Sequence, residues 1–405
     1  MTDDQHRTTW HRSDAWLSES LPDMIAMRRD LHTHPEPAGE EVRTTAIVLD
    51  HMKAAGLQPR VEESATGLIV DIDLADDPAA TRLAIRADMD CVQVSDEKDV
   101  PWASLNDGCC HACGHDAHTT MACFAAHAIS REANAIRAGG ATSNLRFIFQ
   151  PAEEAATGAI EMIDRGALEG VDQIIALHVD PFLDTGHVGM RIGPITANLV
   201  SFKVTLLGQG GHSARPHESI DPIPAAINLV SLLYQLGPRS VDSRRAQCVS
   251  VTSVQGGEAI NAIPDSAEIC GTIRAARIEE ALTLRKMVIQ CADAACLATG
   301  CTSKVDFPHE APATNNDPRV VELMAEAAGD IVAPGCLIHL ELPSLGGEDF
   351  ALYQQKVPGA MARLGTGHGP MDGRPALHSG LFDIDETALL VGSRLLTNTA
   401  LHAVR

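Results

Sequence analysis

The sequence predicts an α/β protein of two domains, in which a mostly parallel sheet with flanking helices is interrupted by an inserted ferredoxin-like α+β domain. The chain has 405 residues, more than one hydrophobic core usually spans. Strand and helix patterns alternate over residues 67–180, which is typical of a parallel sheet. Between residues 199 and 307 the order changes to β-α-β-β-α-β, the split β-α-β pattern of ferredoxin-like domains.

The elements of the first domain follow from their apolar spacing. Helical spacing occurs over residues 22–56, and apolar strand patterns follow in GLIVDIDL and TRLAIRADMD. The patterns beyond them predict a buried helix over 121–129, a strand over 145–150, a helix over 158–168, a strand over 171–180, a helix over 317–332 and a last helix from near Asp385.

The inserted domain has strand patterns separated by two helical ones. The expected strands cover 199–208, 246–257, 266–275 and 301–307, and the expected helices cover 221–237 and 278–300. We therefore expect residues 1–194 and 313–405 to form the first domain and residues 195–312 to form the inserted one.

Composition excludes several partners and indicates a compartment. The formal charge, 31 basic minus 54 acidic residues, is −23, and neither nucleic acid nor an anionic membrane suits so acidic a chain. The polar N-terminus has no apolar segment of a signal peptide, and no apolar run has the ~18 residues of a membrane helix. Eleven scattered cysteines are typical of free thiols in a reducing cytoplasm, where we expect the protein.

Side chains that ligate metals follow the expected strands. In open α/β sheets, sites form at the carboxyl ends of the strands. Nitrogen, sulfur and carboxylate donors together suit a zinc-like divalent ion. The residues in question are Asp88, Asp90, Cys113, His115, Glu153, Glu154 and His178, with His378 added far downstream.

The stretch CCHACGHDAHTT, residues 109–120, allows more than one interpretation. A structural zinc site usually needs a second cysteine pair beside Cys110 and Cys113, and the chain offers none. A redox C-x-x-C is also conceivable, although His111 within it and the following Gly-His-Asp favour metal ligation. Donors drawn from several strand ends favour a catalytic site with an open coordination position.

The Glu153-Glu154 pair supplies what metal-assisted hydrolysis needs besides the metal. Water bound to a metal is acidified, and a nearby carboxylate can accept its proton. Adjacent carboxylates after a proline can point in different directions, so that one binds metal while the other acts as a base. A Glu-Glu pair is more often a solvated turn, but this one directly follows an apolar strand.

Nine segments, in order, resemble those of metal-dependent amidohydrolases such as bacterial hippurate hydrolase, N-acyl-L-amino acid amidohydrolase and the plant auxin-conjugate hydrolases. These belong to the wider aminoacylase and carboxypeptidase G type of metallopeptidases. The resemblance runs from about residue 24 to 398. It is carried by MRRDLHTHPEPAGEE, AIRADMD, HACGHDAHTT, FQPAEEAATGA, ALHVDP, GQGGHSARPHESIDPI, GGEAINAIPDSAEICGTIRA, GGEDFALY and LHSGLFDIDE.

The resemblance implies a site with two divalent metal ions, zinc or manganese, in the first domain. Glu153 would be the general base, and Asp90 would orient a ligating histidine. Asp88 stands where the wider family has a metal-binding histidine, so its role is open. The implied ligands are Cys113, His115, Glu154, His178 and His378.

For the inserted domain the resemblance implies a lid through which two subunits form a homodimer. His212 would stabilise the oxyanion from the partner subunit, and Asn261 and Arg274 would hold the substrate carboxylate. Without the resemblance, we would interpret His212 as a turn residue and Arg274 as part of a surface ion pair.

The implied activity is hydrolysis of the amide bond of an N-acyl amino acid, giving a carboxylic acid and an amino acid. A dipeptidase or other exopeptidase, or an aminohydrolase acting on an aromatic acid, is the alternative within the same family. A catalytically silent relative that binds acyl amino acids as a sensor is the alternative from another class. Cys110, His111 and His118 receive no ligand role, and Cys110 is interpreted as packing.

Overall fold

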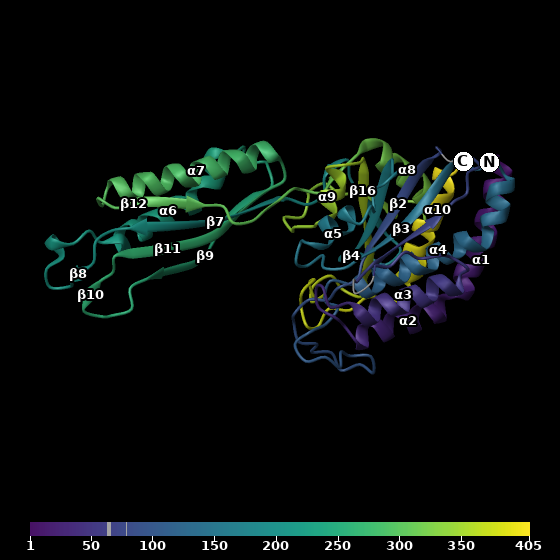
Figure 1. Cartoon of the computed structure of the whole chain (residues 1–405), viewed down its shortest axis with the longest axis horizontal. Coiled ribbons are helices and arrows are strands. Elements are labelled where there is room, and N and C mark those ends of the chain that lie inside the picture. The colour runs from purple at the N-terminus through teal and green to yellow at the C-terminus, as the bar shows by residue number, and fades with distance from the viewer. Residues whose placement is uncertain (63–65, 78) are drawn as a thin grey trace. The chain divides into compact units, whose positions relative to one another are not determined.

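The chain forms two compact units in the computed structural model, which describes residues 1–62, 66–77 and 79–405 (Figure 1). The first unit comprises Met1–Gly193, Asn315–Glu341 and Leu352–Arg405. The second comprises Pro194–Thr314 and Leu342–Ala351. Each unit has its own hydrophobic core.

A seven-stranded, mostly parallel sheet forms the centre of the first unit. Its strand order is β1-β3-β2-β4-β16-β5-β15, and the β1–β3 and β16–β5 pairs are antiparallel. This confirms the predicted mixed α/β fold with a mostly parallel sheet. The strands are β1 (Leu68–Ile72), β2 (Thr81–Asp88), β3 (Ser143–Gln150), β4 (Gln173–Asp184), β5 (Val188–Met190), β15 (Leu337–His339) and β16 (Gly359–Gly367).

Helices flank this sheet and supply much of its core. The longest, α4, is almost wholly buried along its first half and packs against β2, β4 and the C-terminal helix α10. Within the described residues, no helix is both long and apolar enough to span a bilayer. The helices are α1 (Asp3–Glu19), α2 (Leu21–Thr33), α3 (Val42–Ala54), α4 (His115–Ala138), α5 (Gly158–Asp164), α8 (Pro318–Gly329), α9 (Phe350–Gln354) and α10 (Ala388–Ala403).

The second unit is an antiparallel sheet with two helices in the chain order β-α-β-β-α-β. Its strand order is β12-β7-β11-β9, with the short β13 also pairing β7. Burial alternates residue by residue along β7 and β11, so one sheet face packs on the helices. The elements are β7 (Asn198–Leu207), α6 (Pro222–Ser240), β9 (Gln247–Gly256), β11 (Ser266–Ala275), α7 (Ile278–Leu297), β12 (Thr302–Asp306) and β13 (Glu310–Ala311).

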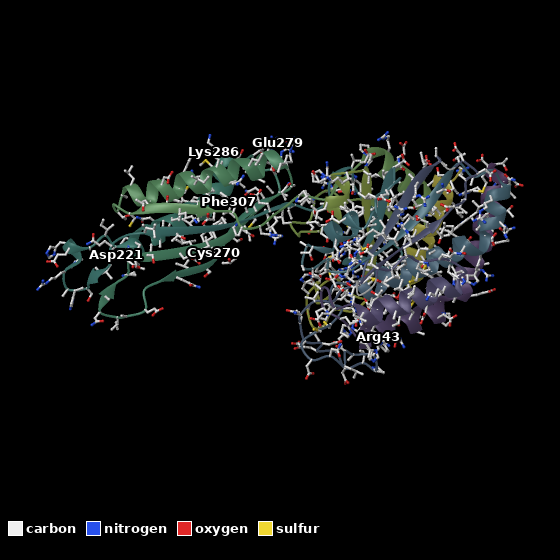
Figure 2. All side chains as sticks on the ribbon, viewed as in Figure 1. Arg43, Asp221, Cys270, Glu279, Lys286 and Phe307 are labelled. Carbon is white, nitrogen blue, oxygen red and sulfur yellow. The ribbon has the colours of Figure 1, made fainter. Side chains whose placement is uncertain are left out.

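A side-chain cap begins α6, and short elements complete both units. Asp221, labelled in Figure 2, accepts a hydrogen bond from the backbone N–H of Ile223 at 2.9 Å and so begins α6. The short elements of the chain are β6 (Gly193–Pro194), β8 (Gly211–His212), η1 (Pro216–Glu218), β10 (Ala262–Ile263) and β14 (Asn315–Asn316).

Three features differ from the sequence-based expectations. The helical region 22–56 is two helices, α2 and α3, and α1 precedes them. Strand β16, which lies between β4 and β5, was not predicted, and neither were the short elements β5, β15 and α9. The segment 342–351 belongs to the second unit rather than the first. It does so because its backbone hydrogen-bonds there, as Ser344 N–H donates to the Ile195 carbonyl at 2.9 Å and Ala197 N–H donates to the Gly346 carbonyl at 3.2 Å.

Buried histidines should make the fold sensitive to acid. Burial, and secondarily His127, lowers the pKa of His51 from 6.5 to about 4. Between these values the unfolded chain binds a proton at His51 that the folded chain does not, so stability is lost as the pH falls from about 6.5 towards 4. We expect His51→Phe, whose new ring would face Phe124, to reduce the loss of unfolding free energy between pH 7 and 5 by about 1 to 2 kcal/mol in denaturant titrations.

The matched control for this prediction is His217→Phe, because the His217 side chain is 76% exposed. This variant should keep the pH dependence of the parent protein. A His51→Phe protein with an unchanged pH dependence would contradict the assignment of a neutral, half-buried His51.

Candidate metal centre

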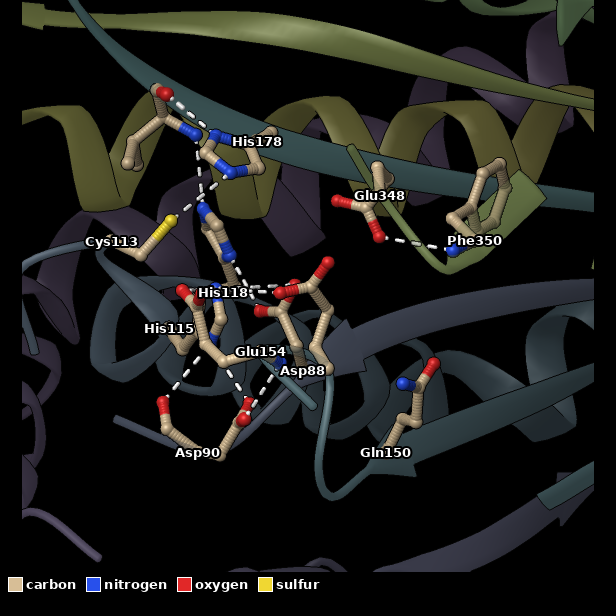
Figure 3. Close-up of polar contacts among 12 residues, drawn as sticks. Asp88, Asp90, Cys113, His115, His118, Gln150, Glu154, His178, Glu348 and Phe350 are labelled. Atoms are coloured by element: carbon tan, nitrogen blue, oxygen red, sulfur yellow. Dashed lines mark hydrogen bonds and ion pairs between the residues drawn. The ribbon is translucent and has the colours of Figure 1, made fainter. Parts of the chain in front are cut away.

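The carboxyl ends of β2, β3 and β4 lie at one edge of the sheet. These strands are parallel neighbours, and the last residues of β2 and β3, Asp88 and Gln150, are paired in register. Chain segments leaving the strands there carry Asp90 and Glu154, while His178 lies on β4 itself (Figure 3). Residues distant in sequence therefore meet because of strand direction alone.

A glycine at the start of α4 brings Cys113 and His115 to this edge. Gly114 is the N-cap residue and has a φ of +82°, which disfavours other residues. A Cβ at this position would lie 2.5 Å from Cγ2 of Val179. The close approach to β4 places Cys113 Sγ 3.5 Å from Nε2 of His178.

The turn that carries Glu153 and Glu154 has a constrained backbone. Ala152 and Ala156 have φ values of 51° and 55°, in the left-handed region. The Ala152 N–H donates to the buried carboxylate of Glu41 at 2.8 Å. A Cβ at Gly158 would lie 1.6 Å from the Pro151 carbonyl oxygen, so only glycine closes the turn without a shift. The turn is thus fixed by contacts on both sides of the glutamates.

His378 reaches the same region from a loop near the C-terminus. Its φ is 65°, and its backbone N–H donates to the Ala112 carbonyl at 2.8 Å, one residue before Cys113. Its side chain is 51% exposed, and Nε2 lies 3.4 Å from Oε1 of Glu154. The loop is therefore attached to the segment that begins α4.

The structure brings the five predicted ligands and Glu153 into overlapping groups of donor atoms. In each group the donor atoms lie within 4.8 Å of one another. Cys113 belongs to two groups, which together contain all five predicted ligands, and a third group contains Glu153. The groups are Cys113/His115/His178, Cys113/Glu154/His378 and His115/Glu153/Glu154.

Asp90 fixes the orientation of His115 and of Glu154. Nδ1 of His115 donates to the backbone carbonyl of Asp90 at 2.9 Å and lies 3.1 Å from its Oδ1. Because both partners are acceptors, the proton is on Nδ1 and Nε2 faces the site. The other carboxylate oxygen accepts the backbone N–H of Glu154 at 2.9 Å. This is the arrangement expected for an aspartate that orients a ligating histidine.

His178 has the neutral form that metals bind. Its Nδ1 lies 2.7 Å from the Val179 carbonyl, so Nδ1 is the donor and Nε2 faces Cys113. Burial, followed by Arg363 and His118, holds the pKa of His178 well below its usual value. An uncharged imidazole with an available Nε2 is a common zinc ligand.

Among the buried polar atoms of the described residues that lack a hydrogen-bond partner, two belong to predicted ligands. They are Nε2 of His115 and Oε1 of Glu154. Such atoms are costly unless a ligand satisfies them. Although burial alone would lower the pKa of His115, Asp88 and Cys113 raise it well above its usual value. The site therefore favours a positive charge, and its N, S and O donors fit a divalent ion.

Asp88 and His118 also lie near His115, but their polar atoms are already used. Asp88 Oδ2 accepts from Nη1 of Arg86 at 2.5 Å, and Oδ1 lies 2.6 Å from Nδ1 of His118. Nε2 of His118 accepts the backbone N–H of Val179 at 2.9 Å. The group Asp88/His115/His118 is therefore a positioning network rather than a metal site. The pairing of Arg86 with Asp88 had no signal in the sequence beyond their spacing on one strand.

Cys110 and His111 show no ligand geometry. Burial raises the pKa of the Cys110 thiol to about 11 and lowers the pKa of His111 to about 3. Both are fully buried, and neither belongs to a donor group among the described residues. Cys110 is part of the hydrophobic core of the first unit.

The remaining three predicted residues belong to the second unit. His212 on β8 is paired in register with Ala262 on β10, and Ser213 N–H donates to the Asn261 carbonyl at 3.2 Å. His212 and Asn261 are therefore neighbours. Arg274 lies on β11, where its Nη1 donates to the Leu345 carbonyl at 2.7 Å. Arg274 forms no ion pair with any described residue, whereas the sequence without the resemblance suggested a surface ion pair.

Comparison with known proteins identifies close relatives over nearly the whole chain. The model of peptidase family M20/M25/M40 matches residues 84–402. N-acetylcysteine deacetylase of Bacillus subtilis is 35% identical over 93% of this chain and 96% of its own length. IAA-amino acid hydrolase ILR1-like 4 of Arabidopsis thaliana is 33% identical over 93% of this chain and 84% of its own.

A solved structure is also similar over both units. It is a dinuclear metal-binding peptidase of family M20 from Bacillus subtilis, with a TM-score of 0.82 and 33% identity. The match covers 96% of this chain and 99% of that one. The relative's description is consistent with the two donor groups that share Cys113.

The role of Asp90 is testable by metal affinity. Asp90→Asn keeps the size of the side chain but weakens its acceptance of the His115 and Glu154 N–H groups. We expect a loss of divalent-metal affinity of about 10- to 100-fold, measured by calorimetric titration of chelator-treated protein. Asp71→Asn, which removes a carboxylate bound by Arg146 away from these donors, should leave the affinity unchanged. Equal losses in both variants would contradict the role of Asp90.

Proposed function

The chain belongs to peptidase family M20/M25/M40, and on this premise we propose that it hydrolyses the amide bond of an N-acyl amino acid with a free α-carboxylate. The products are a carboxylic acid and an amino acid. The observation that carries the proposal is the pair of donor groups that share Cys113, with Glu153 beside them. Amide hydrolysis by members of this family is supported by both curated relatives described above.

The proposed cofactors are two divalent ions, zinc or manganese. Cys113, His115 and His178 would hold one of them, and Cys113, Glu154 and His378 would hold the other, with Cys113 as a thiolate. When bound, the ions would polarise the amide carbonyl and acidify water. Thiolate favours zinc, whereas carboxylate and imidazole also suit manganese.

The protein's own side chains would carry the proton and hold the substrate. Glu153, whose Oε2 lies 4.0 Å from Nε2 of His115, would accept the proton of the attacking water and deliver it to the leaving amine. His212 would donate to the developing oxyanion from the partner subunit. Arg274 and Asn261 would bind the α-carboxylate, Arg274 through its planar guanidinium. Closure of the second unit as a lid would exclude water.

The nature of the substrate is supported by what the relatives act on. N-acetylcysteine deacetylase and IAA-amino acid hydrolase are both named for cleaving an acyl group from an amino acid. The alternative is an exopeptidase, favoured by the peptidase family and by the description of the solved relative. A dipeptide would require a pocket for a free amino group, so the two candidates differ in whether N-acylation is required.

We also propose a reducing compartment, such as the cytoplasm. All eleven cysteines are free thiols, and several of them, including Cys91 and Cys110, are buried near the site. An oxidising environment would favour disulfides instead.

The proposed function predicts that metal removal abolishes amide hydrolysis. We expect close to two metal ions per chain by elemental analysis of protein purified without chelator. Amino acid release from a panel of N-acyl amino acids should disappear on chelation and return with zinc or manganese. Dipeptides in the same panel test the alternative. Protein that binds no metal, and shows no turnover with either ion, would contradict the proposal.

Glu153→Gln separates an enzyme from a binding protein within this experiment. The amide cannot accept the proton of the attacking water, so we expect turnover to fall by about 10²- to 10⁴-fold while both metals stay bound. A sensor of acyl amino acids would instead keep its ligand affinity and show no turnover before or after the change.

We propose that the second unit also forms a homodimer. Strand β9 is one of the two edge strands of its sheet. Beside it, Ile227 and Tyr234 on α6, which are seven residues apart and therefore on one helix face, are 63% and 57% exposed. Val254 on β9 is 55% exposed. Pairing of β9 with its copy would cover this edge and these apolar side chains.

Mixed subunits test the homodimer and the role of His212 together. His212→Ala and Glu153→Gln should each be inactive. If His212 acts in the partner's site, a mixed dimer has one complete site, so equal mixing after subunit exchange should restore about a quarter of the parent activity. Adding Tyr234→Lys to both variants should prevent dimerisation, seen by light scattering, and also prevent this recovery. No recovery from stable mixed dimers would place His212 in its own subunit's site or outside catalysis.

A further inference from the structure

Arg28 on α2 is a fully buried arginine that contacts carboxylates from two other segments of the first unit. Its Nε donates to Asp116 at 2.8 Å, and its Nη2 donates to Asp383 at 2.7 Å. Its Nη1 lies 3.4 Å from Glu386. Because a guanidinium presents its donors in a rigid plane, these contacts fix the two segments relative to each other.

The buried charge of Arg28 is held by these carboxylates. Although burial alone would lower the pKa of Arg28, Asp116 and Asp383 raise it above its usual value. Likewise, burial alone would raise the pKa of Asp116, but Arg28 and His32 hold it well below its usual range. The side chains are therefore a compensated cluster in which each charge depends on the other.

The two segments that Arg28 joins are those that carry ligands at opposite ends of the sequence. Asp116 directly follows His115 and is three residues after Cys113. Asp383 is five residues after His378. Close to the ligands, the two segments are also joined by the hydrogen bond from His378 N–H to the Ala112 carbonyl.

The two donor groups depend on this junction to different extents. The group Cys113/His115/His178 is fully buried and lies on α4, the residues before it and β4. The group Cys113/Glu154/His378 needs a side chain from the far loop, and His378 is 51% exposed. A change in the position of that loop would displace His378 without moving the first group.

We propose that Arg28 is a positioning residue that holds His378 close to Cys113 and thereby sets the affinity for the second metal ion. The inference rests on the proposed function, because it concerns the same two donor groups. It assigns Arg28 no contact with substrate or metal. Its effect is selective, since the first group takes no donor from the loop that carries His378.

The experiment is a titration of chelator-treated protein with Co²⁺, followed by calorimetry and by visible absorption. Co²⁺ reports thiolate binding through a charge-transfer band and needs no turnover. For Arg28→Met we expect the first equivalent to bind as in the parent protein, with the Cys113 band retained. The second equivalent should bind at least ~10-fold more weakly. His378→Ala should show the same pattern.

Arg146→Met is the matched control. Arg146 is also buried and ion-paired in the first unit, with Nε 2.7 Å from Asp71, but its contacts are away from the donor groups. The Arg146→Met protein should bind both Co²⁺ equivalents with the affinity of the parent protein. Asp383→Asn is a milder second variant, since it keeps Arg28 paired with Asp116 and removes only the negative charge of Asp383 on the His378 side. It should weaken the second equivalent alone. Arg28→Lys keeps the positive charge but not the planar guanidinium. Its affinity for the second equivalent should lie between those of the parent protein and Arg28→Met.

The outcomes separate the inference from the proposed function. Two equivalents with parent affinity in both Arg28→Met and Asp383→Asn would overturn the positioning role. So would equal weakening of both equivalents, or the same loss in Arg146→Met, because either indicates general destabilisation. A parent protein that binds no Co²⁺ would contradict the proposed function itself.

Discussion

Burial of ionised side chains at the carboxyl ends of parallel strands is the constraint on which this site depends. Removing a charge from water costs several kcal/mol unless partners compensate it. Asp88 is compensated by Arg86 and His118, and Asp90 accepts N–H groups from His115 and Glu154. Two atoms of predicted ligands, Nε2 of His115 and Oε1 of Glu154, have no hydrogen-bond partner among the described residues, and both belong to the donor groups to which four chain segments contribute.

Backbone strain at the site is likewise compensated by hydrogen bonds. Ala152 and His378 adopt left-handed φ values, each at a cost of about 1 to 3 kcal/mol. In both cases a hydrogen bond from the strained residue's own N–H holds the conformation, to Glu41 and to the Ala112 carbonyl respectively. Ala152 precedes the two glutamates, and His378 is itself a predicted ligand. The strained residues therefore lie at or next to side chains that point into the site.

The two units differed in how well their sequence predicted them. In the second unit, one sheet face packs on helices, so β7 and β11 alternate in burial and their expected ranges lie within one residue of the observed ones. In the first unit, strands are buried on both faces and lose that alternation. Strand β16 was missed for this reason and because GAMARLGTG contains three glycines. The break between α2 and α3 was missed although Pro35, Pro37 and Gly39, which disfavour a helix, lie within it.

The sequence by itself determined which donor types follow which strands, because apolar strand patterns and their polar ends are local features. It also carried the segments by which the family is recognised. Only the tertiary structure decided how those donors are used. His118 and Asp88 form a hydrogen bond with each other, and His111 is buried outside the donor groups. Residues such as Arg28 and Glu41 support the site through partners 88 to 358 positions away. The physical reason is that burial and hydrogen-bond satisfaction depend on three-dimensional neighbours, which strand direction and packing choose and local spacing does not encode.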